Sequence, residues 1–69
     1  MKIKINGNEE SVEASEVTVS QLLEIKKVDM PDMVTVELNE EIIDRDKYAT
    51  QLVKENDAIE FLYFMGGGN

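Results

Sequence analysis

The stretch AIEFLYFM, residues 58–65, alternates in the manner of a β-strand whose two faces differ. Successive side chains of a strand point to opposite sides of its sheet. Because Glu60 would be costly to bury without a partner, we expect its face to be exposed and the other face to pack in the core. The expected core side chains are Ile59, Phe61 and Tyr63, and the expected exposed ones are Ala58, Glu60, Leu62 and Phe64. Leu62 and Phe64 therefore predict an exposed apolar surface beside the C-terminal residues.

The N-terminal residues predict a β-hairpin. Residues 1–5, MKIKI, alternate apolar and basic side chains as a half-buried strand does. The sequence NGN at residues 6–8 is typical of a tight hairpin turn. A second, weaker strand is expected to return through Val12 and Ala14.

The segment TVSQLLEIKKV, residues 18–28, predicts a short amphipathic helix. Thr18 and Gln21 have the spacing of a capping box at its start. Lys26 and Lys27 are expected in its last turn, where positive charge suits the helix dipole. Its apolar side is formed by Val19, Leu22 and Leu23.

The second half of the chain predicts further strands. Residues 33–39, MVTVELN, alternate again, and EEII at residues 40–43 predicts one more short strand. Asp44 is expected to cap a brief helical turn that runs to Tyr48, and KENDA at residues 54–58 predicts a turn. Together these elements predict a ββαββ order, which is an α+β fold with one helix covering one face of a mixed β-sheet.

Composition excludes several classes of function. The chain has 69 residues, enough for one small domain with a single core. Its net charge of −8, from 15 acidic and 7 basic residues, would repel a phosphate backbone, so we expect no nucleic-acid partner. With no His and no Cys, it lacks the groups for Cys–His or Ser–His catalysis and for thiolate metal sites. The longest apolar run, FLYFM, is too short to cross a bilayer, so we expect a cytoplasmic protein with no membrane partner.

Four acidic residues gather after the third predicted strand: Glu40, Glu41, Asp44 and Asp46. Such a cluster could hold a cation weakly, but a solvated charged loop is the commoner explanation and the spacing is not that of an EF-hand. We therefore assign no metal site.

The chain finishes with Gly66, Gly67, Gly68 and Asn69. Glycine has no Cβ, so a run of it is narrow and flexible and can thread a slot in a partner. Four residues extend at most about 13–14 Å, enough to carry a terminal carboxylate into a partner's active site. Transfer of AMP from ATP would make that carboxylate an electrophile. Terminal glycines are also common in disordered chain ends that have no function.

The β-grasp-like order of elements, the capped TVSQLL, the segment VELNEEIIDRDKY and the strand DAIEFLYFMGGG that leads into glycines together carry a family resemblance. They resemble the sulfur carrier proteins of thiamine biosynthesis, the ThiS/MoaD family. The likeness spans essentially the whole chain. It implies a ubiquitin-like β-grasp domain over residues 1–65 and a flexible glycine-rich tail over residues 66–69.

The resemblance also implies a function. In that family an E1-like adenylyltransferase uses ATP to adenylate the terminal glycine carboxylate, a cysteine desulfurase relays the sulfur that makes a thiocarboxylate, and thiazole synthase receives it. The chain would then be a carrier without a bound cofactor, acted on by its partners rather than an enzyme. By this resemblance Gly68 carries the sulfur on the tail of Gly66 and Gly67, and Leu62 and Phe64 contact the partner enzymes.

Asn69 departs from the family pattern, because the family ends on glycine. We expect a metalloprotease to remove Asn69 and expose Gly68, as in related carriers with extended tails. Two alternatives stay open. One is a related carrier that serves molybdopterin or homocysteine/cysteine synthesis, and the other is a ubiquitin-like binding module that never reacts.

Overall fold

The computed structural model describes residues 1–29 and 31–63, with the side chains of all of them except Asp32 and Tyr63. This part of the chain forms a five-stranded sheet, a two-stranded sheet and one α-helix. The strands are β1 Lys2–Ile5, β2 Asn8–Ser11, β3 Glu16–Thr18, β4 Val34–Leu38, β5 Glu41–Ile43, β6 Leu52–Lys54 and β7 Ala58–Tyr63. The helices are α1 Val19–Ile25 and two short 3-10 helices, η1 Pro31–Met33 and η2 Arg45–Lys47.

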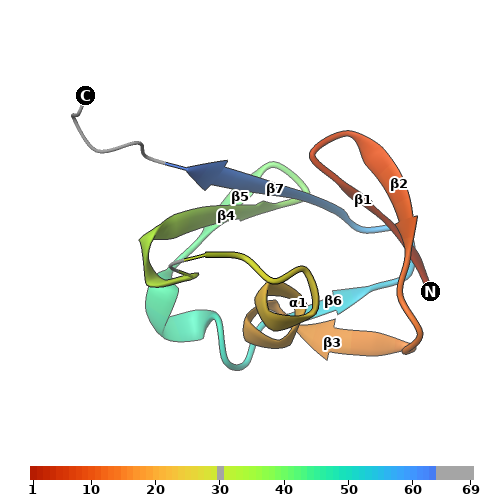
Figure 1. Ribbon diagram of the computed structural model, residues 1–69, viewed down its shortest axis with the longest axis horizontal. Helices are drawn as coiled ribbons and strands as arrows, with labels where there is room; N and C mark the ends of the chain where they lie inside the picture. The colour runs from red at the N-terminus through yellow and green to blue at the C-terminus, as the bar shows by residue number, and fades with distance from the viewer. Residues whose placement is uncertain (30, 64–69) are drawn as a thin grey trace.

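The last strand of the described chain, β7, lies in the middle of the five-stranded sheet, whose order is β2-β1-β7-β4-β5. It runs parallel to β1 and antiparallel to β4. Figure 1 shows β7 between the N-terminal hairpin and the β4–β5 hairpin, with α1 lying against one side of this sheet. The predicted α+β fold, one helix on a mixed sheet, is confirmed.

The tight turn between β1 and β2 is also confirmed. Asn6 and Gly7 have φ angles of 52° and 85°. Both angles are left-handed, and Asn-Gly is the pair that adopts such a turn at least cost. Ile3 and Ile5 point into the core, as the alternation predicts.

The predicted continuation of the second strand through Val12 and Ala14 is wrong, because β2 ends at Ser11. Ser11 lies opposite Lys2, the first residue of β1, so no residue of β1 is left to pair with the residues after Ser11. The N–H of Val12 makes one further bond, to the carbonyl oxygen of Met1 at 2.8 Å, and its side chain turns into the core.

The start of α1 is the capping box that the sequence predicts. The Thr18 hydroxyl accepts from the Gln21 N–H at 3.1 Å, and Gln21 Oε1 accepts from the Thr18 N–H at 2.8 Å. Val19, Leu22 and Leu23 are all buried, so the predicted apolar side is confirmed.

The end of α1 differs from the prediction, because Lys26 is the C-cap and Lys27 lies beyond it. Lys27 has a left-handed φ of 54°. Its N–H bonds to the Glu24 carbonyl, and the Val28 N–H bonds to the Leu23 carbonyl, each at 3.0 Å. This is a Schellman motif, in which the left-handed residue is usually glycine. The helix therefore ends too early for either lysine to lie in its last turn.

Two short strands were not predicted. β3 and β6 pair antiparallel as a separate two-stranded sheet, with Val17 opposite Val53. Each has three residues, which is too few to show a period in the sequence. β3 ends at Thr18, the N-cap of α1, and β6 ends at Lys54, the first residue of the predicted turn.

The predicted role of Asp44 holds only for its main chain. It is the N-cap of η2, but its side chain makes no capping hydrogen bond. The Lys47 N–H bonds instead to the Asp44 carbonyl oxygen at 2.9 Å, since a 3-10 turn closes on the main chain of its first residue. The strands β4 and β5 that precede it are confirmed.

The core fills the space between the five-stranded sheet, α1 and the two-stranded sheet. No polar or charged residue is buried among the described residues. The core residues are Ile3, Ile5, Val12, Val17, Val19, Leu22, Leu23, Val34, Val36, Leu38, Tyr48, Val53, Ile59 and Phe61.

Candidate functional site

The site residues predicted from the sequence lie at or beyond the end of β7. Leu62 is described and is 36% exposed, while Ile59 and Phe61 on the opposite face are 1% and 6% exposed. Glu60 is exposed as well, so the predicted faces of this strand are confirmed for these residues. The predicted boundary between domain and tail lies outside the described part of the chain. The remaining predicted site residues also lie outside it, and they are Phe64, Gly66, Gly67, Gly68 and Asn69.

Strand register identifies the neighbours of Leu62. Residues directly opposite each other in an antiparallel pair share a face of the sheet. Leu62 lies opposite Thr35, Glu60 lies opposite Glu37, and Glu37 in turn lies opposite Ile42 on β5. We call the side of the five-stranded sheet that carries these five residues the open face, because α1 covers the other side.

Ile42 is a further candidate contact residue, and its place on the open face was not predicted from the sequence. Its side chain is 66% exposed, more than that of Leu62. Ile42 and Ile43 are adjacent in a short strand, and either could have pointed outward. The register of β5 on β4 decides between them, and a three-residue strand gives no signal of register. The open face therefore carries two exposed apolar side chains on different strands.

The open face is also acidic. Glu37 and Glu60 face each other across β4 and β7, and among the described residues no cation forms an ion pair with either carboxylate. Beside them is a shallow hollow of about 260 Å³. Its lining contains three carboxylates and one ammonium group, from Glu37, Glu40, Glu60 and Lys4. The arrangement suits a partner that brings apolar side chains and positive charge.

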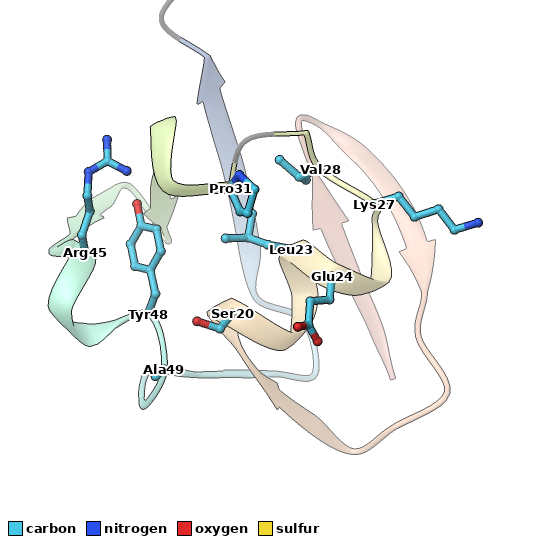
Figure 2. Close-up of a pocket in the computed structure, with 9 residues that line it drawn as sticks. All are labelled: Ser20, Leu23, Glu24, Lys27, Val28, Pro31, Arg45, Tyr48 and Ala49. Atoms are coloured by element: carbon cyan, nitrogen blue, oxygen red, sulfur yellow. The ribbon is translucent and has the colours of Figure 1, made fainter.

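A second hollow, of about 350 Å³, lies on the helix side of the sheet between α1, η1 and η2. Figure 2 shows Leu23, Pro31 and Tyr48 around it, with Ser20 and Glu24 from α1 at its lower edge. Ser20 would need a neighbouring base to act as a nucleophile, and the chain contains no His. We assign no chemistry to this hollow.

Within residues 1–29 and 31–63, no group of three or more acidic side chains converges on a point that could hold a metal ion, and Glu40, Glu41, Asp44 and Asp46 form no such group. No helix in the described part of the chain has the length and apolar character needed to span a membrane.

Comparison with known proteins places these features in a family. The ThiS family model matches residues 2–68. A crystal structure of the thiamine biosynthesis protein ThiS from Geobacter metallireducens superposes with a TM-score of 0.90 at 45% identity, covering 99% of this chain and 100% of that one. A solution structure of a thiamine biosynthesis protein from the same organism gives a TM-score of 0.83 at 44% identity, covering 100% of this chain and 90% of that one. The β-grasp fold is thereby confirmed.

Two curated relatives are larger proteins. A thiazole synthase of Paramagnetospirillum magneticum is 42% identical over the whole of this chain, and one of Magnetococcus marinus is 34% identical over 99% of it. The chain spans only 21% and 20% of their lengths. From the family match, which runs through nearly the entire sequence, and from the near-complete superposition on a ThiS structure, we conclude that this chain belongs to the ThiS family.

Proposed function

We propose that this chain is a sulfur carrier of thiamine biosynthesis, whose C-terminal glycine is adenylated and converted to a thiocarboxylate that donates sulfur for thiazole formation. The observation that carries the proposal is the extent of the family match, which includes all three tail glycines and stops at residue 68. This supports Gly68 as the sulfur-bearing residue and sets Asn69 apart as an addition to the family pattern.

The chemistry requires little from the chain itself. A carboxylate oxygen of Gly68 attacks the α-phosphorus of ATP, pyrophosphate leaves, and the product is a mixed anhydride with AMP. The terminal sulfur of a persulfide from the desulfurase relay then attacks the carbonyl carbon and displaces AMP, and a thiol reduces the resulting acyl disulfide, which releases the thiocarboxylate and leaves a disulfide between the two thiols. These steps take place in an E1-like adenylyltransferase supplied by a cysteine desulfurase relay, which accounts for a carrier that has neither His nor Cys. We place this exchange in the cytoplasm.

Thiazole synthase is the sulfur acceptor in this proposal. Two proteins of that name contain a segment that resembles this entire chain within a polypeptide about five times as long. Sequences that are joined in one polypeptide are expected to act together, so these relatives support the pairing. They also favour the thiamine pathway over molybdopterin or homocysteine/cysteine synthesis.

Partners would dock on the open face. Leu62 and Ile42 supply apolar contact, and Glu37 and Glu60 supply negative charge beside them. Interfaces of this kind combine an apolar centre with a charged rim that steers encounter. The activating enzyme and thiazole synthase would each present apolar side chains ringed by basic residues, and would receive the tail in a slot.

Asn69 must be removed for Gly68 to react, and a metalloprotease is the proposed trimming enzyme. The test is the intact mass of the untagged protein purified from its own cells. We expect chains that end at Gly68, with some heavier by the exchange of one oxygen for sulfur. If every molecule retains Asn69 and none carries sulfur, the carrier proposal fails and a non-reactive binding module replaces it.

A truncation separates those two functions directly. A chain that lacks residues 66–69 keeps every described element of the fold. As a carrier it would still bind its partner but support no thiazole formation in a reconstituted assay. As a binding module it would support its function in full.

A further inference from the structure

The C-terminal end of β7 is held mainly from one side. On the β1 side, strand pairing covers only Ala58 and Ile59. Asn6 extends this edge, since its N–H donates to the Ile59 carbonyl at 2.9 Å and its Oδ1 accepts from the Phe61 N–H at 2.8 Å. Beyond Phe61 the described strand pairing of β7 is with β4 alone, where Leu62 lies opposite Thr35.

The start of β4 has a strand partner on one edge only, which is the edge that faces β7. On its other edge, β5 pairs with residues 36–38 of β4 and not with Val34 or Thr35. The Tyr48 hydroxyl fills this place: it donates to the Val34 carbonyl at 2.9 Å and accepts from the Val36 N–H at 3.0 Å. One hydroxyl thus satisfies the acceptor and the donor that a neighbouring strand would otherwise satisfy, and both hydrogen bonds are buried.

Tyr48 is anchored where it can hold β4 in place. Its main-chain carbonyl accepts from the Ser20 N–H in the first turn of α1 at 2.8 Å, and its side chain is 7% exposed. Arg45 adds a second donor to the Val34 carbonyl at 3.1 Å. Figure 2 shows the side chains of Arg45 and Tyr48 next to each other and extending in the same direction. The start of α1 is thereby connected to the start of β4 through one residue.

We propose that Tyr48 is a positioning residue for the sulfur-carrying terminus. Its hydroxyl holds the first residues of β4, and these hold the last residues of β7, which residues 64 and 65 separate from the tail in the sequence. This inference rests on the proposed function for the role of the tail. The proposed effect of Tyr48 is indirect, because it passes through the placement of Leu62 and Tyr63 at the end of β7.

Tyr48→Phe tests the first link, because it keeps the ring and removes only the hydroxyl. The Val34 carbonyl would retain Arg45, whereas the Val36 N–H would lose its acceptor. Neighbouring residues of a strand direct their N–H and C=O groups to opposite edges. Val34 and Val36 direct these groups toward Tyr48, so Thr35 directs its N–H and C=O toward Leu62 on β7. We expect the amide protons of Thr35 and Leu62 to exchange with solvent about tenfold faster, the order expected when one buried hydrogen bond is lost.

The matched control is Val17→Ala on β3, a buried residue outside the five-stranded sheet. Amide exchange is compared by NMR on full-length chains, in conditions adjusted so that both variants have the same global stability. Faster exchange confined to β4 and the end of β7 in Tyr48→Phe supports the inference. Equal exchange at Thr35 and Leu62 in the two variants overturns it.

The second link is tested by pyrophosphate exchange with the adenylyltransferase and MgATP, using chains that end at Gly68. Tyr48→Phe should lower kcat several-fold and leave KM unchanged, because misplacement by about 1 Å can cost up to about 100-fold in rate while the open face still docks. Val17→Ala should change neither constant. If both variants match wild type, the inference fails alone; if the wild-type chain is never adenylated, the proposed function fails first.

Discussion

Glu37 on β4 lies directly opposite Glu60 on β7, with both side chains on the open face of the sheet. Like charges in this position destabilise an antiparallel pair. Among the described residues no ion pair relieves either carboxylate, and Lys4 on β1 is the cation that shares their hollow. The isolated domain thus bears an unfavourable pair that a basic partner would turn into a favourable one.

Replacing Glu60 with Lys should stabilise the domain on its own. The repulsion becomes a cross-strand attraction to Glu37, which should raise the free energy of unfolding by about 0.2–1 kcal/mol. Urea unfolding measures the change. Glu60→Gln is the matched control, because it removes the repulsion without adding an attraction and should gain less. A Lys variant no more stable than the Gln variant would show that the two side chains do not interact.

The same Glu60→Lys variant should associate more slowly with the adenylyltransferase. Steering by charge is screened over a Debye length of about 10 Å at 0.1 M salt, so the wild-type rate constant should fall with added salt more steeply than that of the variant. Stopped-flow mixing at several salt concentrations measures this. The control is Glu16→Lys on β3, which changes the net charge equally but lies outside the five-stranded sheet. Equal slowing by both variants would mean that total charge, and not the open face, governs association.

Leu62→Asp and Ile42→Asp should weaken docking without unfolding the domain. Both side chains are exposed, and a charge in the apolar centre of an interface should raise KM for adenylation by about tenfold or more. Phe64→Asp should act in the same way if the prediction from the sequence is right. Ile25→Asp is the control, since Ile25 is 49% exposed but belongs to α1 on the other side of the sheet. An unfolded Leu62→Asp chain would show that this residue supports the core.

Lys27→Gly should stabilise the domain relative to Lys27→Ala. The φ of 54° at this Schellman position is favourable only for residues that tolerate left-handed backbone. Both substitutions remove the same charge and nearly all of the side chain, so their difference isolates the backbone term, expected at about 1 kcal/mol. Thermal unfolding followed by circular dichroism gives this difference. Equal melting temperatures would contradict the assignment of strain to Lys27.

Leu22→Ala should leave little of the folded state. Leu22 is fully buried in the core, and such a truncation costs about 2–5 kcal/mol. A domain of this size has a net stability of only about 3–5 kcal/mol. Ile25→Ala on the same helix, where the side chain is half exposed, should remain folded. The fraction folded is read from amide NMR spectra, and a well-dispersed spectrum for Leu22→Ala would show that the core is less dependent on α1 than its burial indicates.

The features predicted correctly from the sequence are those encoded by neighbouring residues. Asn6 and Gly7 specify their turn, Thr18 and Gln21 specify the helix start, and the alternation around Glu60 assigns the faces of β7. Each depends on contacts within a few positions. These signals were strong enough to predict the fold class and two residues of the open face, Glu60 and Leu62.

The features that could not be predicted depend on pairing between distant segments. Ile42 belongs to the open face because of the register of β5 on β4, and β3 has too few residues to be recognised without β6. The hydroxyl of Tyr48 reaches across 12 positions to Val36 and 14 to Val34, and nothing in the sequence near Tyr48 marks that role. The roles of such residues can be recognised only in the folded structure.

The central place of β7 links folding to recognition. Before β7 is inserted, the N-terminal hairpin and the β4–β5 hairpin have no strand between them, and Leu62 and Ile42 share no surface. During synthesis β7 emerges after every other described element, and the tail emerges after β7. Under the proposed function, a newly made or misfolded copy would therefore contain the tail glycines but lack the proposed docking surface. Activating enzymes that require both would spend ATP only on chains whose folding is complete.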